Sequence, residues 1–132
     1  MAIVASADSA NAWRTIGSLK VERNQGFGIS DLYAKAGNPT PVSRDLAAQL
    51  SKALQDRHIY IRPGISLKGA VPMPEAVVAF TRGDKEVDVY LCFQSNIMVV
   101  GQALSDFDPG RPGILKIVKK IFPNDRKIQS LK

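Results

Sequence analysis

The feature that most constrains the fold is a pair of apolar segments, residues 76–81 and 87–94, separated by the polar stretch 82–86. Val, Phe and Tyr favour extended backbone, and a short polar loop that contains glycine is typical of a β-hairpin. Residues 97–100 have the same apolar character and follow a short turn, so we expect a third strand there. The sequence therefore predicts an antiparallel sheet in its second half.

Side chains on the second of these strands alternate between two faces, because successive residues of a strand point to opposite sides. Val87, Val89 and Leu91 share one face. Asp88 and Tyr90 share the other. We expect the first face to lie against the core, and the second is a candidate surface for a partner.

Two segments have apolar residues at helical spacing. In residues 41–55, the hydroxyl of Ser43 can accept a hydrogen bond from a backbone N–H at the helix start. The second helix is predicted to begin at 108–112, with Asp108 as its N-cap, and to end at Pro123. The apolar stripes are Leu46, Ala47, Leu50, Ala53 and Leu54 in the first helix and Ile114, Leu115, Ile117, Val118, Ile121 and Phe122 in the second.

The remaining elements have weaker patterns. We predict a strand at residues 13–21, a helical turn at 30–35 and short extended pieces at 58–61 and 65–67. This order of elements predicts an α+β fold, with an antiparallel sheet of about four to five strands and two main helices packed on one face.

The chain is expected to form one domain. Its 132 residues can bury a single hydrophobic core without metals or disulfides. Residues 1–12 are rich in Ala, Ser, Asp and Asn and have no periodicity, so we expect a flexible N-terminal arm. The α+β domain then spans residues 13–132.

The formal net charge of +6 is unevenly distributed along the chain. Residues 1–72 carry 9 basic and 5 acidic side chains, residues 73–110 carry 2 and 6, and residues 111–132 carry 7 and 1. An acidic middle and a basic end can present faces of opposite sign to a partner. The candidate binding residues are Lys116, Lys119, Lys120, Arg126 and Lys127 in the basic segment, with Asp88 and Tyr90 on the sheet.

Catalytic chemistry has little support in the sequence. Cys92 and His58 are the only cysteine and histidine, so a thiolate–imidazole pair requires the fold to bring them together. One Cys and one His cannot furnish a zinc site. Asp106 and Asp108 offer the oxygen ligands that calcium prefers, but the calcium-loop pattern is absent. We expect no cofactor and no resident metal, and no catalytic residue is assigned.

Two stretches, Tyr60–Ile65 and Val87–Phe93, resemble a motif of small uncharacterised bacterial proteins that are often exported or lipid-anchored. The motif is an apolar strand with proline near its bend, followed later by Val-Asp, apolar residues and Cys-Phe. Members often carry two further cysteines, where this chain has Tyr60 or its neighbour and Ser95, so a disulfide role is absent here. The resemblance implies a similar fold and favours an exported bacterial protein, but it implies no activity.

The favoured hypothesis is a non-enzymatic protein-binding module of the bacterial envelope or periplasm. One alternative is a nucleic-acid-binding protein that uses the basic C-terminal helix, which a salt titration would reveal. Another is a small enzyme that uses Cys92, which requires a depressed thiol pKa or a deep polar pocket. No apolar run approaches the length of a membrane span, so no membrane insertion is expected.

Overall fold

The computed structural model describes residues 2–17, 33–69 and 72–132. In this part of the chain six strands form one sheet in the order β2-β1-β3-β4-β5-β6, and every neighbouring pair is antiparallel. The strands are β1 (Ser9–Gly17), β2 (Tyr33–Val42), β3 (Ala76–Arg82), β4 (Lys85–Cys92), β5 (Ile97–Val100) and β6 (Ala103–Asp106). The helices are α1 (Ala2–Ala5), α3 (Arg44–Gln55), α4 (Arg111–Ile121) and α5 (Arg126–Gln129), with the 3-10 turns η1 (Arg57–Ile59) and η2 (Asp108–Gly110).

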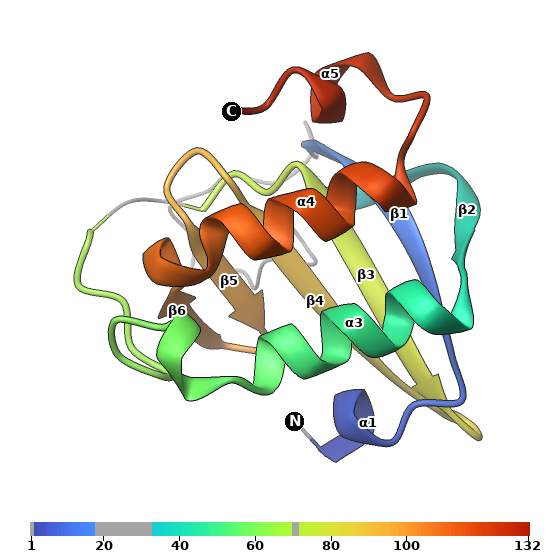
Figure 1. Ribbon diagram of the computed structural model, residues 1–132, viewed down its shortest axis with the longest axis horizontal. Coiled ribbons are helices and arrows are strands. Elements are labelled where there is room, and N and C mark those ends of the chain that lie inside the picture. The colour runs from blue at the N-terminus through green and yellow to red at the C-terminus, as the bar shows by residue number, and fades with distance from the viewer. Residues whose placement is uncertain (1, 18–32, 70–71) are drawn as a thin grey trace.

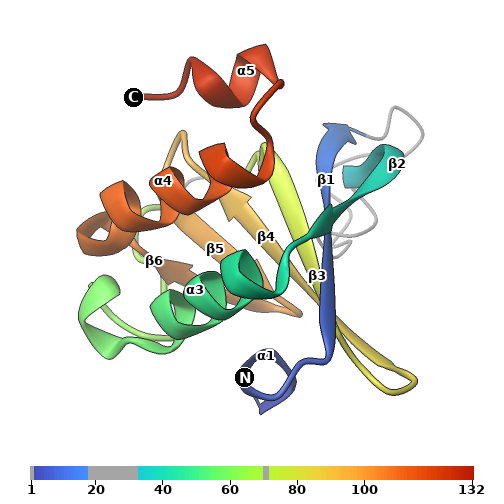
Figure 2. The same cartoon turned by 45° about the vertical axis from the view of Figure 1, so that its right-hand side comes forward.

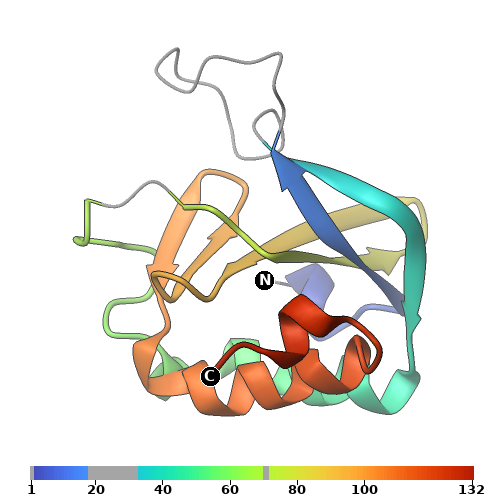
Figure 3. The same cartoon turned by 90° about the horizontal axis from the view of Figure 1, so that it is seen from above.

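The two long helices, α3 and α4, lie side by side on one face of the sheet (Figure 1, Figure 3). The short helix α1 lies beside α3, and α5 follows the end of α4 (Figure 2). The predicted α+β class with one antiparallel sheet is confirmed. The expected number of four to five strands is wrong, because the described residues contain six strands and, besides the two main helices, two short ones.

The β3–β4 hairpin confirms the strongest prediction from the sequence. Arg82 pairs with Lys85, and Gly83 and Asp84 form the turn between them. Gly83 has a φ of 60°, a left-handed conformation that glycine adopts without strain and that two-residue hairpin turns require. The predicted third strand is also confirmed, as β5.

Both faces of the sheet contribute buried side chains. The inner cluster lies between the sheet and the helices and includes Phe80, Val89, Leu91, Leu50 and Val118. The predicted core face of β4 is thus confirmed. The outer cluster, on the opposite face, consists of Tyr33, Val77, Tyr90, Cys92, Ile97 and Val99.

The first strand begins earlier than predicted. β1 starts at Ser9, so residues 9–12 of the expected arm pair with β3, and Val4 of α1 is buried in the inner cluster. Alanine has a weak strand propensity, but Ala10 and Ala12 are buried where β1 lies between two strands, so pairing and burial override propensity. Residues 18–21 of the predicted strand lie outside the described residues.

The second strand replaces a predicted helical turn. Residues 30–32 of that turn lie outside the described residues, and from Tyr33 onward the chain is β2. β2 contains Pro39 and Pro41, and it is at the edge of the described sheet, where a strand tolerates proline because one side of its ladder has no partner.

Helix starts and short connections also differ from the sequence prediction. Ser43 caps α3 as predicted, since its hydroxyl accepts a hydrogen bond from Leu46 N at 3.2 Å. Asp108 does not cap α4, whose N-cap is Gly110. The predicted extended piece at 58–61 begins instead as the 3-10 turn η1, because the Asp56 side chain caps this turn by accepting a hydrogen bond from His58 N. No strand forms at 65–67, and β6 was not predicted.

Candidate functional site

The three lysines of α4 lie on the side of the helix that faces away from the core. The apolar stripe of α4 buries Ile114 and Val118, which leaves Lys116 and Lys120 exposed and Lys119 half-buried. Residues three and four apart are neighbours on a helix surface, so the three lysines form one cationic patch. Among the described residues none of them forms an ion pair. We call these three residues the α4 basic face.

The short helix α5 is fixed to both the sheet and α4. Asp125, its N-cap, accepts two hydrogen bonds from Arg14 Nη1 at 2.9 and 3.0 Å. Gln129 Nε2 donates to the carbonyl oxygens of Lys119 and Phe122 at 2.7 and 2.9 Å. These contacts hold α5 at the end of the α4 basic face.

The other two basic candidates lie on α5. Arg126 is exposed. Lys127 is also exposed but lines a separate small cavity of about 260 Å³ with Arg14 and Glu75. The structure therefore brings the α4 lysines together and places Lys127 at a different site.

Glu75 at that cavity is a buried carboxylate that the sequence analysis missed. It is 6% exposed, and its Oε1 accepts a hydrogen bond from Phe93 N at 2.7 Å. Burial raises the pKa of Glu75, although the Phe93 N–H and the charges of Lys127 and Arg111 oppose the shift. Its hydrogen bond to the chain just after β4 gives it a structural role.

Asp88 and Tyr90, the candidates on the sheet, have different environments. Lys35 Nζ lies 3.1 Å from carboxylate oxygens of both Asp88 and Glu86, and 4.4 Å from the centre of the Trp13 ring. Burial alone would lower the pKa of Lys35, but the two carboxylates raise it. Burial raises the pKa of Asp88 and the neighbouring carboxylate of Glu86 adds to the rise, although Lys35 opposes it. Tyr90 is 3% exposed in the outer cluster, so it is not available to a partner.

Cys92 and His58 do not form a catalytic pair. Cys92 is 1% exposed, belongs to the outer cluster, and its Sγ lies 3.2 Å from Ser95 Oγ. His58 is exposed on η1, on the connection between α3 and the loop that follows. A nucleophile and its base need to be within hydrogen-bond reach, so this geometry gives no support to a thiol enzyme.

The two carboxylates considered for calcium are both engaged by protein groups. Asp106 is 3% exposed and accepts from Ser66 Oγ at 2.6 Å. Asp108 lies 2.6 Å from Lys68 Nζ and also accepts from Asn96 Nδ2. In the described ranges, no group of three or more His, Cys, Asp or Glu side chains could hold a metal ion.

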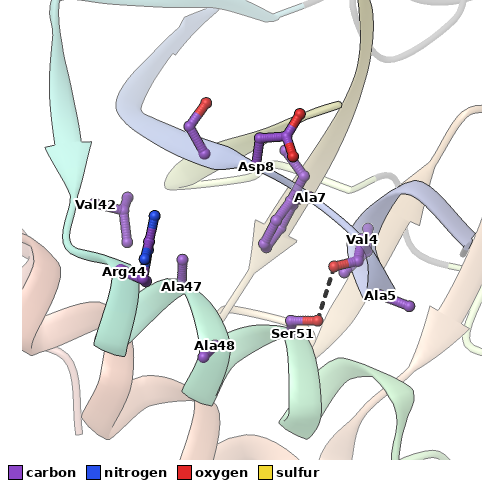
Figure 4. A pocket seen from close by; sticks show the side chains of 11 residues that line it. Val4, Ala5, Ala7, Asp8, Val42, Arg44, Ala47, Ala48 and Ser51 are labelled. Carbon is purple, nitrogen blue, oxygen red and sulfur yellow. Dashed lines mark hydrogen bonds between the residues drawn. The ribbon is translucent and has the colours of Figure 1, made fainter. Parts of the chain in front are cut away.

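A cleft of about 440 Å³ lies between α1, β1 and α3 (Figure 4). Small side chains leave this space open, among them Ala5, Ala7 and Ala47. Ser51 Oγ closes one end by donating to the carbonyl oxygen of Val4 at 2.8 Å. Alanines make up much of the cleft wall, and few polar groups converge on it. The lining therefore does not indicate a particular ligand.

An apolar recess of about 480 Å³ lies between the end of α3 and the β5–β6 hairpin. The hydroxyl of Tyr60 in its wall donates to Leu54 O at 2.5 Å and contacts Met98 Sδ at 3.5 Å. Burial raises the pKa of Tyr60 to about 12. The lining residues come from separate elements, so no local motif in the sequence predicts the recess; they are Leu54, Gln55, Arg57, Tyr60, Pro63, Gly64, Met98, Val100, Ala103 and Ser105.

Comparison of the chain with protein-family models, with curated proteins and with solved structures finds no match. None of the described helices has the length and apolar character needed to cross a membrane.

Proposed function

We propose that the protein is a non-enzymatic binding module that recognises an acidic partner protein through the α4 basic face. The observation that carries this proposal is the grouping of Lys116, Lys119 and Lys120 on one exposed side of α4, without an ion-pair partner among the described residues.

Helix stability explains only in part why three lysines are grouped on one side of α4. Lys119 and Lys120 lie in the last turn, where the helix dipole favours cations. Lys116 lies a turn earlier, and like charges three or four residues apart destabilise a helix by about 0.2 to 0.5 kcal/mol. A surface that pairs with carboxylates of a partner gives all three lysines a common role.

A protein partner is favoured over a nucleic acid because apolar surface adjoins the basic one. Ile117 follows Lys116 and is half-buried in a shallow hollow of about 870 Å³ over α3. Mixed apolar and charged surface is typical of protein interfaces. Nucleic-acid affinity rests mainly on phosphate contacts.

Charge reversal with a matched control tests the proposal. The variant Lys116→Glu, Lys120→Glu and the control Arg82→Glu, Lys85→Glu change the net charge equally, but the control does so at the exposed β3–β4 turn. The probes are a labelled poly-glutamate peptide and a labelled DNA duplex, each measured by fluorescence anisotropy at low and raised salt.

We expect the wild type and the control to bind poly-glutamate and the α4 variant to lose at least about tenfold in affinity, or about 1.4 kcal/mol. Equal loss in both variants would mean that net charge alone drives binding and would overturn the proposed surface. Tighter binding to the duplex, with a steep dependence on salt, would support the nucleic-acid alternative instead.

A further inference from the structure

The chain segment beside the apolar recess at the end of α3 carries two exposed apolar side chains. Ile61 and Ile65 are 48% and 53% exposed, and they adjoin the lining residues Tyr60 and Gly64 in the chain. Single exposed apolar side chains are ordinary on soluble proteins, but an apolar hollow is the kind of surface that ligands and partners occupy. The recess is therefore the strongest candidate for a second contact.

The backbone that forms this wall is held firmly against β6. Ile61 N donates to Asp106 O at 2.9 Å, Gly64 N donates to Ser105 Oγ at 2.8 Å, and the Tyr60 hydroxyl is bound to Leu54 O. The polar groups of the wall that form these hydrogen bonds have their partners within the protein. The free surface that remains is apolar, so it suits an apolar side chain.

The charged side chain in the lining of the recess is a cation. Arg57 lines the recess and Arg62 is exposed in the loop beside it, and within the described ranges neither forms an ion pair. The nearest acidic residue along the chain, Asp56, is not a lining residue of the recess; it lines the hollow over α3, and its carboxylate accepts from His58 N at 2.9 Å. An occupant with carboxylates beside its apolar group is thus complementary to this site.

The recess is also connected to the α4 basic face. Gln55 lines both the recess and the shallow hollow over α3, and that hollow includes Lys52 and reaches Ile117 of α4. An extended segment that leaves the recess at Arg57 can therefore pass Lys52 and, with it, Asp56 on the way to α4.

We propose that the recess receives an apolar side chain from an acidic segment of the partner protein, as the anchor of the complex. This inference rests on the proposed function, because it adds an anchor to the same acidic partner. Interfaces commonly derive most of their affinity from one or two side chains inserted in such a pocket. A concave site favours insertion of a side chain over contact with a flat lipid surface.

The test uses a random peptide library displayed on phage, selected on the full chain. Ala103→Glu introduces a carboxylate at an exposed residue of the recess wall, and Arg57→Glu reverses its cation. Ala34→Glu is the matched control, since Ala34 is exposed on β2 and lines neither the recess nor the hollow over α3. Thermal unfolding confirms that each variant is folded.

We expect enriched peptides that place an apolar residue next to Asp or Glu. Their affinity should fall at least about tenfold in Ala103→Glu and Arg57→Glu, and stay unchanged in Ala34→Glu. Acidic peptides that lose binding in the Lys116→Glu, Lys120→Glu variant but not in Ala103→Glu would overturn the anchor and leave the proposed function standing.

Two other results would also overturn the inference. The first is a selection that enriches no acidic peptide, which would count against the proposed function as well. The second is sedimentation of the chain with phosphatidylglycerol vesicles that Ile65→Asp abolishes, because the exposed isoleucines would then contact lipid instead of a peptide.

Discussion

Arg14 and Asp125 are 111 residues apart in the sequence, yet the guanidinium of Arg14 donates to both carboxylate oxygens of Asp125. Arg14 lies in β1 and Asp125 caps α5, so this ion pair connects the first strand to the last helix. Both side chains are 23% exposed. Burial alone would raise the pKa of Asp125, but the Ile128 N–H and Arg14 lower it, so the carboxylate stays ionised.

Loss of this ion pair should release α5 from the sheet. We expect Arg14→Ala to lower the free energy of unfolding by about 1 to 2 kcal/mol, because it removes charge-assisted hydrogen bonds that are partly shielded from water. Amide hydrogen exchange should quicken in α5 and not in α3. Arg126→Ala, at an exposed neighbour, should change stability by less than about 0.5 kcal/mol. Unchanged protection of α5 in Arg14→Ala would show that the Gln129 hydrogen bonds and the buried Ile128 are sufficient to hold the helix.

Local patterns were sufficient for the elements that form the centre of the fold. Alternation and a glycine turn predicted the β3–β4 hairpin, and the stripe with the Ser43 cap predicted α3. The edge strands β2 and β6 escaped prediction for a physical reason. These two segments form strands because they pair with a neighbouring strand, and not because their own residues favour extended backbone. In addition, β2 contains prolines that only an edge strand accepts.

The candidate site residues also fall into those whose position local sequence predicts and those whose position it does not predict. The outward position of Lys116, Lys119 and Lys120 follows from helical spacing, and the structure places them there. The burial of Tyr90 could not be predicted from its own strand, because alternation gives the face of a residue but not what covers that face. The recess at Tyr60 depends on four separate elements, which local sequence does not relate.

Gly110 is required for the close approach of η2 to η1. A Cβ atom at residue 110 would lie 2.4 Å from Ile59 Cβ, whereas a Cβ at Gly113 would meet nothing within 4 Å. We expect Gly110→Ala to destabilise the protein by about 1 to 3 kcal/mol. Gly113→Ala should stabilise it by up to about 1 kcal/mol, because alanine is the better helix former. Urea unfolding measures both, and equal effects would contradict the close approach.

Cys92 should be protected from thiol reagents in the folded state, because its side chain is 1% exposed within the outer cluster. We expect the rate of labelling by a disulfide reagent to rise with urea in step with unfolding, and Cys92→Ala to abolish it. The variant should also lose about 1 to 2 kcal/mol of stability, since it shortens a buried side chain. Rapid labelling without urea would show that the outer cluster opens, and it would revive the alternative of a reactive thiol.

Glu75 should make stability depend on pH. Its folded pKa is raised above the usual value, so the folded state binds this proton more tightly than the unfolded state does. Its contribution to the free energy of unfolding is therefore largest below the unfolded pKa and decreases as the pH rises through the folded pKa. Glu75→Gln removes the titrating group and leaves an oxygen that can accept from Phe93 N.

Urea unfolding of the wild type and Glu75→Gln from about pH 3 to about pH 8 isolates this effect, because the other carboxylates are common to both proteins. The stability of the wild type relative to Glu75→Gln should decrease as the pH rises. Asp84→Asn, at the exposed β3–β4 turn, is the charge-matched control. A difference that grows with pH would mean that Lys127 and Arg111 outweigh the burial of Glu75, and that this carboxylate is held as an ion.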